Sequence, residues 1–218
     1  ESNTHGQQIK AQPHSVASSA IHTLPNVTGD LIPGKIGGTN FTNSLLVGHA
    51  TTGTLNNAIY NTGVGIDALK AITLGDSNTA IGRRAGSVLT SGSTNTLVGQ
   101  QAGRGITTTS NNTAVGENAL RNQPTGTGNT ALGKNALYAT TADYNIGIGY
   151  TSGNNITSGS GNVVIGVADV PSATADDQLS ISDGEDGTVV WLTGDSAGTV
   201  SANGGHLTTT GKALVMGF

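Results

Sequence analysis

The sequence predicts an all-β protein, a parallel β-solenoid (β-roll) of about eight 17-residue coils with a small β-module at each end. Three observations support this fold class. A short motif ending in glycine recurs at a nearly constant spacing, and 34 of the 218 residues are glycine. The repeated unit also lacks the apolar periodicity of a helix and is rich in Gly, Thr and Asn, which favour turns and strands over helices.

The repeated motif is Asn-Thr-Ala-Val-Gly with its variants, and each copy closes on a corner glycine. The corner glycines are Gly48, Gly65, Gly82, Gly99, Gly116, Gly133, Gly149 and Gly166. Their numbers increase by 17 at each of five successive steps, then by 16 and finally by 17 again. Each coil is expected to hold two short strands and two tight turns, with glycine where a positive φ or close backbone approach is needed. The aliphatic residue before each corner, such as Ile81 or Val115, is expected inside the coil.

The chain is expected to have three parts. Residues 1–40 contain three of the five prolines and are interpreted as a β or extended connector or docking segment. Residues 41–170 form the solenoid. Pro171 is expected to end the stacking because proline cannot donate to a ladder, and residues 171–218 form a C-terminal β-module. Strands are expected in this module at 178–182, 188–192 and 213–216.

The repeat also predicts which residues lie above one another. Residues 17 apart should sit about 4.8 Å apart on neighbouring coils. The asparagines that open the motif would form a ladder in which each amide bonds the next; they are Asn61, Asn78, Asn95, Asn112, Asn129, Asn145 and Asn162. On the outside, Asp67 precedes Arg84 in one column and Glu117 precedes Lys134 in another, so opposite charges are expected to meet.

The small apolar content of each unit predicts self-association. Each unit has four to six apolar residues, mostly small. These residues can fill a thin slit, but they leave the sheet faces and ends of a lone solenoid uncovered. We therefore expect a homotrimer that surrounds one axis, with a repeat region about 40 Å long at about 4.8 Å per coil.

Composition argues against several functions. The chain has no cysteine, which excludes disulfides and thiolate metal sites. A net charge of −4 with nine Lys and Arg gives no basic surface for nucleic acid, and no segment reaches the roughly 20 apolar residues needed for membrane insertion. No cofactor or metal is expected, because the five histidines lack metal or triad spacing and the acidic turn at 183–186 lacks a calcium-loop pattern.

Two features of the repeat region invite enzymatic interpretations. Residues 128–135 nearly fit a phosphate-binding loop, but the final Ser or Thr is missing and no helix is expected after them. Hexapeptide acyltransferases are solenoids with an inter-subunit histidine, and His49 is the histidine of the repeat region; the 18-residue coil with an aliphatic at every sixth position is absent. A non-enzymatic protein is expected.

Three tyrosines in two adjoining units are candidate receptor-binding residues. Tyr138, Tyr144 and Tyr150 lie where the shorter, 16-residue interval occurs. Aromatic rings serve as platforms for sugars and equally as packing residues in irregular coils. Packing is the favoured interpretation of these tyrosines, and receptor binding is the alternative.

The unit N-T-A-[IV]-G-x-x-A resembles the head repeat of trimeric autotransporter adhesins over residues 44–170. In that family each repeat is one coil of a left-handed β-roll, and three chains form the head. The common unit of the family is shorter than the present one, and the extra residues are expected to enlarge the Thr/Ser/Gly turn.

The flanks resemble modules of tailed-bacteriophage fibre proteins. The segments that carry this resemblance are 7–32, 177–184 and 207–218. The resemblance implies a non-enzymatic tail fibre of a phage virion that contributes to host attachment. Its expected partners are two further copies of itself, other virion proteins and a host surface glycan or protein. The alternative is a bacterial cell-surface adhesin or an extracellular filament subunit.

Overall fold

The computed structural model describes residues 34–36, 40, 42–48, 54–202 and 205–207, which belong to one of two compact units of the chain, residues 32–218. Most of the connector expected at 1–40 and the strand expected at 213–216 lie outside the described residues.

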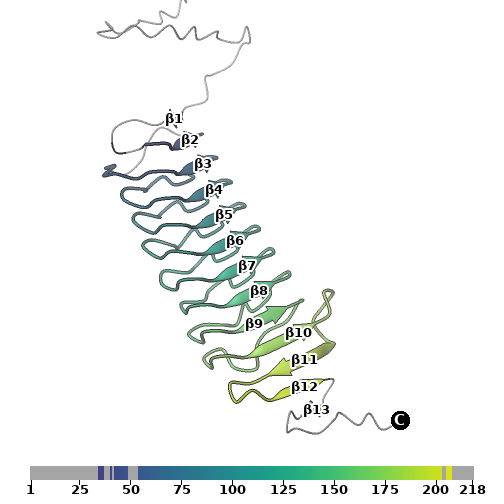
Figure 1. Cartoon of the computed structure of the whole chain (residues 1–218). Helices are drawn as coiled ribbons and strands as arrows, with labels where there is room; N and C mark the ends of the chain where they lie inside the picture. The colour runs from purple at the N-terminus through teal and green to yellow at the C-terminus, as the bar shows by residue number, and fades with distance from the viewer. Residues whose placement is uncertain (1–33, 37–39, 41, 49–53, 203–204, 208–218) are drawn as a thin grey trace, which may run out of the picture. The chain divides into compact units, whose positions relative to one another are not determined.

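Within the described residues, 13 strands form one sheet in chain order (Figure 1). The first seven are β1 (Gly34–Ile36), β2 (Leu45–Val47), β3 (Thr62–Val64), β4 (Thr79–Ile81), β5 (Thr96–Val98), β6 (Thr113–Val115) and β7 (Thr130–Leu132). The others are β8 (Ile146–Ile148), β9 (Val163–Ile165), β10 (Leu179–Ser182), β11 (Val190–Gly194), β12 (Val200–Ala202) and β13 (Gly205–Leu207).

The strands from β2 to β10 are parallel, and each lies one coil beyond its predecessor. Thr79 pairs with Thr96, which is a step of 17 along the chain. Thr130 pairs with Ile146 and Val163 with Leu179, which are steps of 16. The predicted parallel β-solenoid, with about eight coils and a period of about 17, is confirmed.

The direction of pairing changes at both ends of the stack. β1 runs antiparallel to β2, and β10 to β13 pair antiparallel in succession. Stacking does not end at Pro171, because β10 pairs parallel with β9. Pro171 is exposed in a turn, where its missing N–H breaks no rung of the sheet.

Within the described residues, each coil from β2 to β9 contains one three-residue strand, so the expectation of two strands per coil is wrong. The second strand was expected around the aliphatic residue seven positions after each corner, and that segment forms turns and bends instead, as on either side of Ile72. Between the corner and this segment the backbone turns left-handed twice. After the Gly65 corner, Asp67 has φ 62° and Leu69 has φ 52°. Residues with positive φ cannot continue an extended strand, and the chain instead folds back through tight turns.

The strand alternation places a different residue inside the coil from the one expected. Ala80 and Ala114, at the strand centres, are fully buried. Ile81 is 42% exposed and Val115 half-buried, since successive strand residues point to opposite faces. The expectation that Ile81 and Val115 lie inside the coil is therefore wrong, and the aliphatics before the corners form an outward column.

Large core residues come from the strand centre in some coils and from the turn after the corner in others. At Gly103 an added Cβ would lie 2.5 Å from Leu97 Cδ2, so the strand-centre leucine occupies the space of that side chain. One coil later the arrangement is reversed, with the small Ala114 at the strand centre and Leu120 at the position equivalent to Gly103, both fully buried. In these two coils, a leucine on one side of the core thus faces a small residue on the other.

The corner glycines are required by conformation and by contact. Their φ values run from 103° at Gly166 to 137° at Gly133, a region that side chains rarely adopt. A Cβ on Gly116 would lie 2.5 Å from the carbonyl oxygen of Gly133, in the next coil. Each corner therefore closes directly over its neighbour.

The motif asparagines are fully buried and hydrogen-bond one another along most of the stack. Asn78 Oδ1 accepts from the backbone N–H and the side-chain amide of Asn95, both at 3.0 Å. The Asn78 amide also donates to Gly92 O at 2.9 Å, which ties the strand side to the opposite turn. At the shorter step from Asn129, the side-chain amide of Asn145 donates to Thr140 Oγ1 at 3.5 Å instead.

Gln178 continues this column beyond Asn162. Its backbone N–H and side-chain amide both donate to Asn162 Oδ1, at 2.9 and 3.1 Å. The longer side chain also donates to the carbonyls of Ser172 and Ala175. It thereby closes the ladder where the sheet turns antiparallel.

Candidate functional site

Two outward columns on the coil surface carry the side chains most suited to binding. The Gly+2 column, two residues after each corner glycine, contains Asp67, Arg84, Gln101, Asn118, Asn135 and Thr151. The Gly+5 column contains Lys70, Ser87, Arg104, Arg121, Tyr138 and Asn154. The residues between the two columns point into the coil, as Ala119 and Leu120 do, so the floor between the columns is backbone.

These columns border a surface cavity of about 450 Å³ in the later coils. Asn118, Asn135, Tyr138 and Asn154 line this cavity, and we call the cavity the amide groove. The groove crosses three successive coils, because Asn118, Asn135 and Asn154 each belong to a different one.

Hydrogen bonds hold part of the amide groove in place and leave the rest available. Asn118 Nδ2 donates to Asn135 Oδ1 at 3.2 Å, which uses one donor and one acceptor of the pair. Within the described part of the chain, the Asn154 side chain has no hydrogen-bond partner. The groove therefore presents amide donors and acceptors together.

Arg121 positions the aromatic ring of the groove. Its Nη1 donates to the Tyr138 hydroxyl, and its guanidinium carbon lies 5.5 Å from the ring centroid. The guanidinium is attracted to the aromatic ring, and among the described residues its buried Nε has no hydrogen-bond partner. Glu117 and Lys134, one residue before the two groove asparagines, pair with each other at 3.1 Å.

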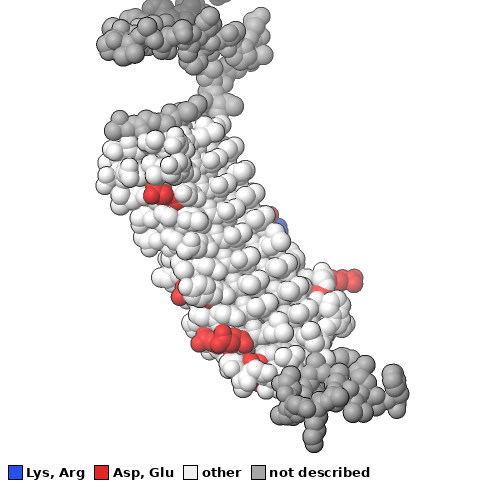
Figure 2. All heavy atoms as spheres, in the orientation of Figure 1, with Lys and Arg blue, Asp and Glu red and all other residues white. Residues whose placement is uncertain are grey.

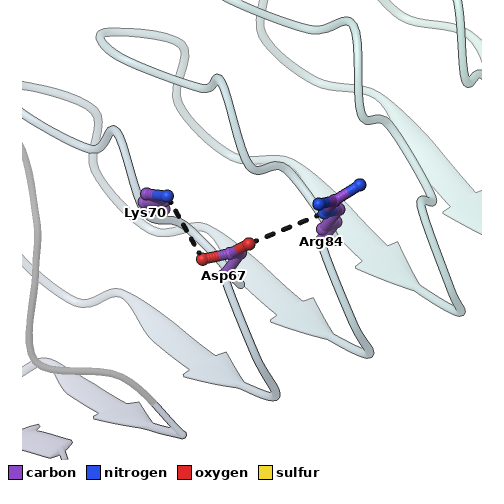
Figure 3. Close-up of polar contacts among 3 residues, drawn as sticks. All are labelled: Asp67, Lys70 and Arg84. Atoms are coloured by element: carbon purple, nitrogen blue, oxygen red, sulfur yellow. Dashed lines mark ion pairs between the residues drawn. The ribbon is translucent and has the colours of Figure 1, made fainter.

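The same two columns carry ionised groups in the earlier coils. Asp67 pairs with Lys70 at 3.4 Å and with Arg84 at 3.5 Å (Figure 3). We call these three residues the charged segment. Together with Glu117–Lys134, the Asp67–Arg84 pair confirms the predicted meeting of opposite charges.

Partial desolvation by itself raises the pKa of Asp67, but the hydrogen bonds and charges of Lys70 and Arg84 together lower it below the ordinary value of 3.8. The carboxylate is therefore held ionised and paired. The charged segment thus has ion pairs at the column positions that carry amides and Tyr138 in the amide groove.

The three candidate tyrosines do not form one cluster. Tyr138 lines the amide groove. Tyr144 and Tyr150 belong to other columns and are 64% and 56% exposed. The Tyr144 ring lies against Gly128, where an added Cβ would be 2.6 Å from Tyr144 Cδ1. Of the three tyrosines only Tyr138 lines this groove, and receptor binding stays a prediction.

The sequence interpretation missed Asn118, Asn135, Asn154 and Arg121 as site residues. The available signal was the replacement of charges by amides in one outward column, at Asn118 and Asn135, beside an aromatic in the next. Recognising it required knowing that the two columns are neighbours across the tight turn.

Other motifs have structural explanations. Residues 128–135 contain β7 and the Gly133 corner. In the acidic turn, Asp183 accepts hydrogen bonds from the backbone N–H groups of Val189, Gly187, Asp186 and Glu185, which lower its pKa. His49 lies outside the described residues.

Among the described residues, no three His, Asp or Glu side chains are grouped to hold a metal ion. No helix in that part of the chain has the length and apolar character to span a bilayer. Comparison with known proteins finds no matching family model, no matching curated protein and no matching solved structure.

Proposed function

We propose that this chain is a non-enzymatic structural protein of a phage virion, a tail fibre that contributes to attachment to the host surface. The observation that carries the proposal is the stack of parallel coils joined by a continuous buried Asn column. Such a stack is a stiff spacer, because bending it would break hydrogen bonds in every coil. Its repeat and flanks resemble adhesin heads and phage fibres, whose work is mechanical and multivalent.

The fibre is proposed to be a homotrimer that buries the strand face. The strands β2–β9 contain no charged residue, and Figure 2 shows the area along them without Asp, Glu, Lys or Arg. Their outward aliphatic column is exposed in the single chain: Ile81 is 42% and Leu132 47% exposed. A continuous apolar column of this kind is typical of an interaction surface, and copies around one axis would cover it.

Sedimentation equilibrium tests the trimer. We expect a mass of three times 21.6 kDa for the full chain. Ile81→Asp combined with Leu132→Asp should yield folded monomers, because a charge is added to the outer face and not to the core. Gln100→Asp is the matched control, since Gln100 is exposed outside the strands. A monomeric wild-type chain contradicts the proposal.

Immunoelectron microscopy tests the location. Antibody against this chain should label fibres on phage particles purified from the source cells, where it would lie beside other virion proteins. Labelling of the cell surface instead supports the alternative, a bacterial adhesin or extracellular filament subunit. The resemblance of the repeat to adhesin heads favours this alternative.

A further inference from the structure

We propose that the amide groove binds a short, neutral oligosaccharide that runs along the coil stack. This inference deepens the attachment role proposed above and rests on it for its biological meaning. It assigns a ligand class to residues of the chain that no comparison connects with binding.

The lining residues match the chemistry of a sugar. Sugar hydroxyls both donate and accept hydrogen bonds, as the side-chain amides of Asn118, Asn135 and Asn154 do. The apolar C–H face of a pyranose ring packs on an aromatic ring, and Tyr138 supplies one whose orientation is fixed by Arg121. The volume of about 450 Å³ lies in the usual range of small-ligand sites, about 300–1,000 Å³.

The charges around the groove favour a neutral ligand over an anionic one. The four lining residues carry no charge, and Lys134 next to them is paired with Glu117 at 3.1 Å. An anionic sugar would therefore find no unpaired cation among the lining residues. A basic peptide would equally find no carboxylate in the lining, which consists of three amides and one phenol.

The geometry of the stack suits an extended sugar chain. Neighbouring coils lie about 4.8 Å apart, a distance comparable with the length of one pyranose ring. A chain laid along the stack would pass from Asn118 to Asn135 to Asn154 as it crosses the three coils. In a trimer, three such grooves would raise the avidity for a repetitive surface glycan.

A glycan array probed with the full-length chain tests the ligand class. The array carries neutral, sialylated and phosphorylated oligosaccharides. We expect binding to neutral members, and the strongest of them is then used for calorimetric titration. Binding confined to acidic members, or no binding to any member, overturns the proposal.

Two variants test the site itself. Tyr138→Ala should weaken binding of the selected neutral oligosaccharide about tenfold, which corresponds to about 1.4 kcal/mol for the lost aromatic contact. Tyr150→Ala is the matched control, because this exposed tyrosine lies outside the groove lining and should leave affinity unchanged. Equal losses in both variants, or none in either, contradict the assignment.

A further variant fills the groove with an ion pair that the chain already tolerates elsewhere. Asn118→Asp combined with Asn135→Arg places at these positions the pair formed by Asp67 and Arg84. It should abolish binding while the circular dichroism spectrum and the trimer mass stay as in the wild type. Retained binding would overturn the proposal.

The outcomes separate the groove from the fibre. If virion fibres are labelled and the array shows no neutral ligand, the groove assignment fails and the fibre proposal survives. If neutral glycans bind through Tyr138 and the antibody labels cells, the groove assignment survives and the phage proposal fails.

Discussion

The charged segment and the amide groove occupy the same two surface columns of one solenoid. Asp67 and Arg84 are one coil apart and joined by an ion pair, and Asn118 and Asn135 are one coil apart and joined by an amide hydrogen bond. Their backbones are nearly identical, with φ values of 62° and 61° in the first pair and 60° and 58° in the second. The backbone of the coil therefore fixes the position of each outward side chain, but different residue types can occupy that position.

This difference separates residues that build the frame from residues that can carry function. The frame consists of the corner glycines, the interior aliphatics and the buried asparagines, which both regions share. The outer columns change from charged to amide and aromatic without a change of backbone. Substitutions should accordingly cost much in the frame and little in the columns.

The largest effect is expected at a corner glycine. Gly116→Ala should lower the free energy of unfolding by roughly 4 kcal/mol or more, because φ is 133° and the new Cβ would lie 2.5 Å from Gly133 O. Urea unfolding followed by circular dichroism at fixed protein concentration measures this loss. Because the frame is common, the variant should damage the charged segment and the amide groove together.

Gly184→Ala is the control for this substitution. An added Cβ at Gly184 meets no atom within 4 Å. It should change the free energy of unfolding by less than about 0.5 kcal/mol. Similar losses in Gly116→Ala and Gly184→Ala would contradict the account of the corners.

The next largest effect concerns the core between the two regions. Leu97→Ala should cost about 2–5 kcal/mol, because Leu97 is fully buried and its removal leaves a cavity. Adding Gly103→Leu should recover most of this loss. The double variant reproduces the next coil, where Ala114 faces Leu120, and Leu120 already adopts the φ of 49° that is close to the φ of 56° at position 103.

Gly103→Leu alone is the contrasting variant. An added Cβ there lies 2.5 Å from Leu97 Cδ2, so a leucine beside an intact Leu97 should overpack the core. Unfolding of the four proteins forms a double-mutant cycle. If the two single costs simply add in the double variant, the two positions do not share one space.

The period, the parallel stacking and the outer charge pairs were all readable from the sequence. A repeat of nearly constant length places equivalent residues above one another. This fixes the register between neighbouring strands without any knowledge of the turns. The inward position of Ala80 rather than Ile81 could not be predicted, because two adjacent apolar residues in a three-residue strand carry no alternation signal. The chain between the corner and the expected second strand has left-handed φ values at residues such as Leu69. A leucine in the sequence does not indicate that conformation.

The amide groove was only partly predictable for the same reason. Tyr138 stood out as a rare aromatic, whereas Asn154 is one asparagine among many. Its place beside Tyr138 follows from the turn geometry between the Gly+2 and Gly+5 columns. Sequence spacing alone did not reveal that these columns are neighbours.

A smaller effect is expected when the two regions exchange chemistry. Asn118→Asp with Asn135→Arg should change the free energy of unfolding by less than about 1 kcal/mol, because a partly exposed ion pair replaces a partly exposed hydrogen bond between side-chain amides. Thermal unfolding at neutral pH measures this change. Ala114→Asp is the opposite control and should prevent folding, because it puts a charge at a fully buried strand centre four residues before Asn118.

The smallest effect is the acid response of the charged segment. The pKa of Asp67 is lower in the folded protein than its ordinary value of 3.8, so its pairing stabilises the fold above about pH 3.8. That contribution is lost as the pH falls through the folded pKa. Arg84→Gln should raise the pKa of Asp67 toward 3.8, measured by NMR titration of the side-chain carboxyl carbon. Salt at about 1 M should do the same in the wild type, because it screens exposed charges.

Asp183 is the internal control for this titration. The hydrogen bond from the backbone N–H of Val189 and those of its neighbours lower the pKa of Asp183, and no cation takes part. Arg84→Gln should therefore leave the pKa of Asp183 unchanged while that of Asp67 rises. Equal shifts at both carboxyls would show that the Arg84 pair does not set the ionisation of Asp67.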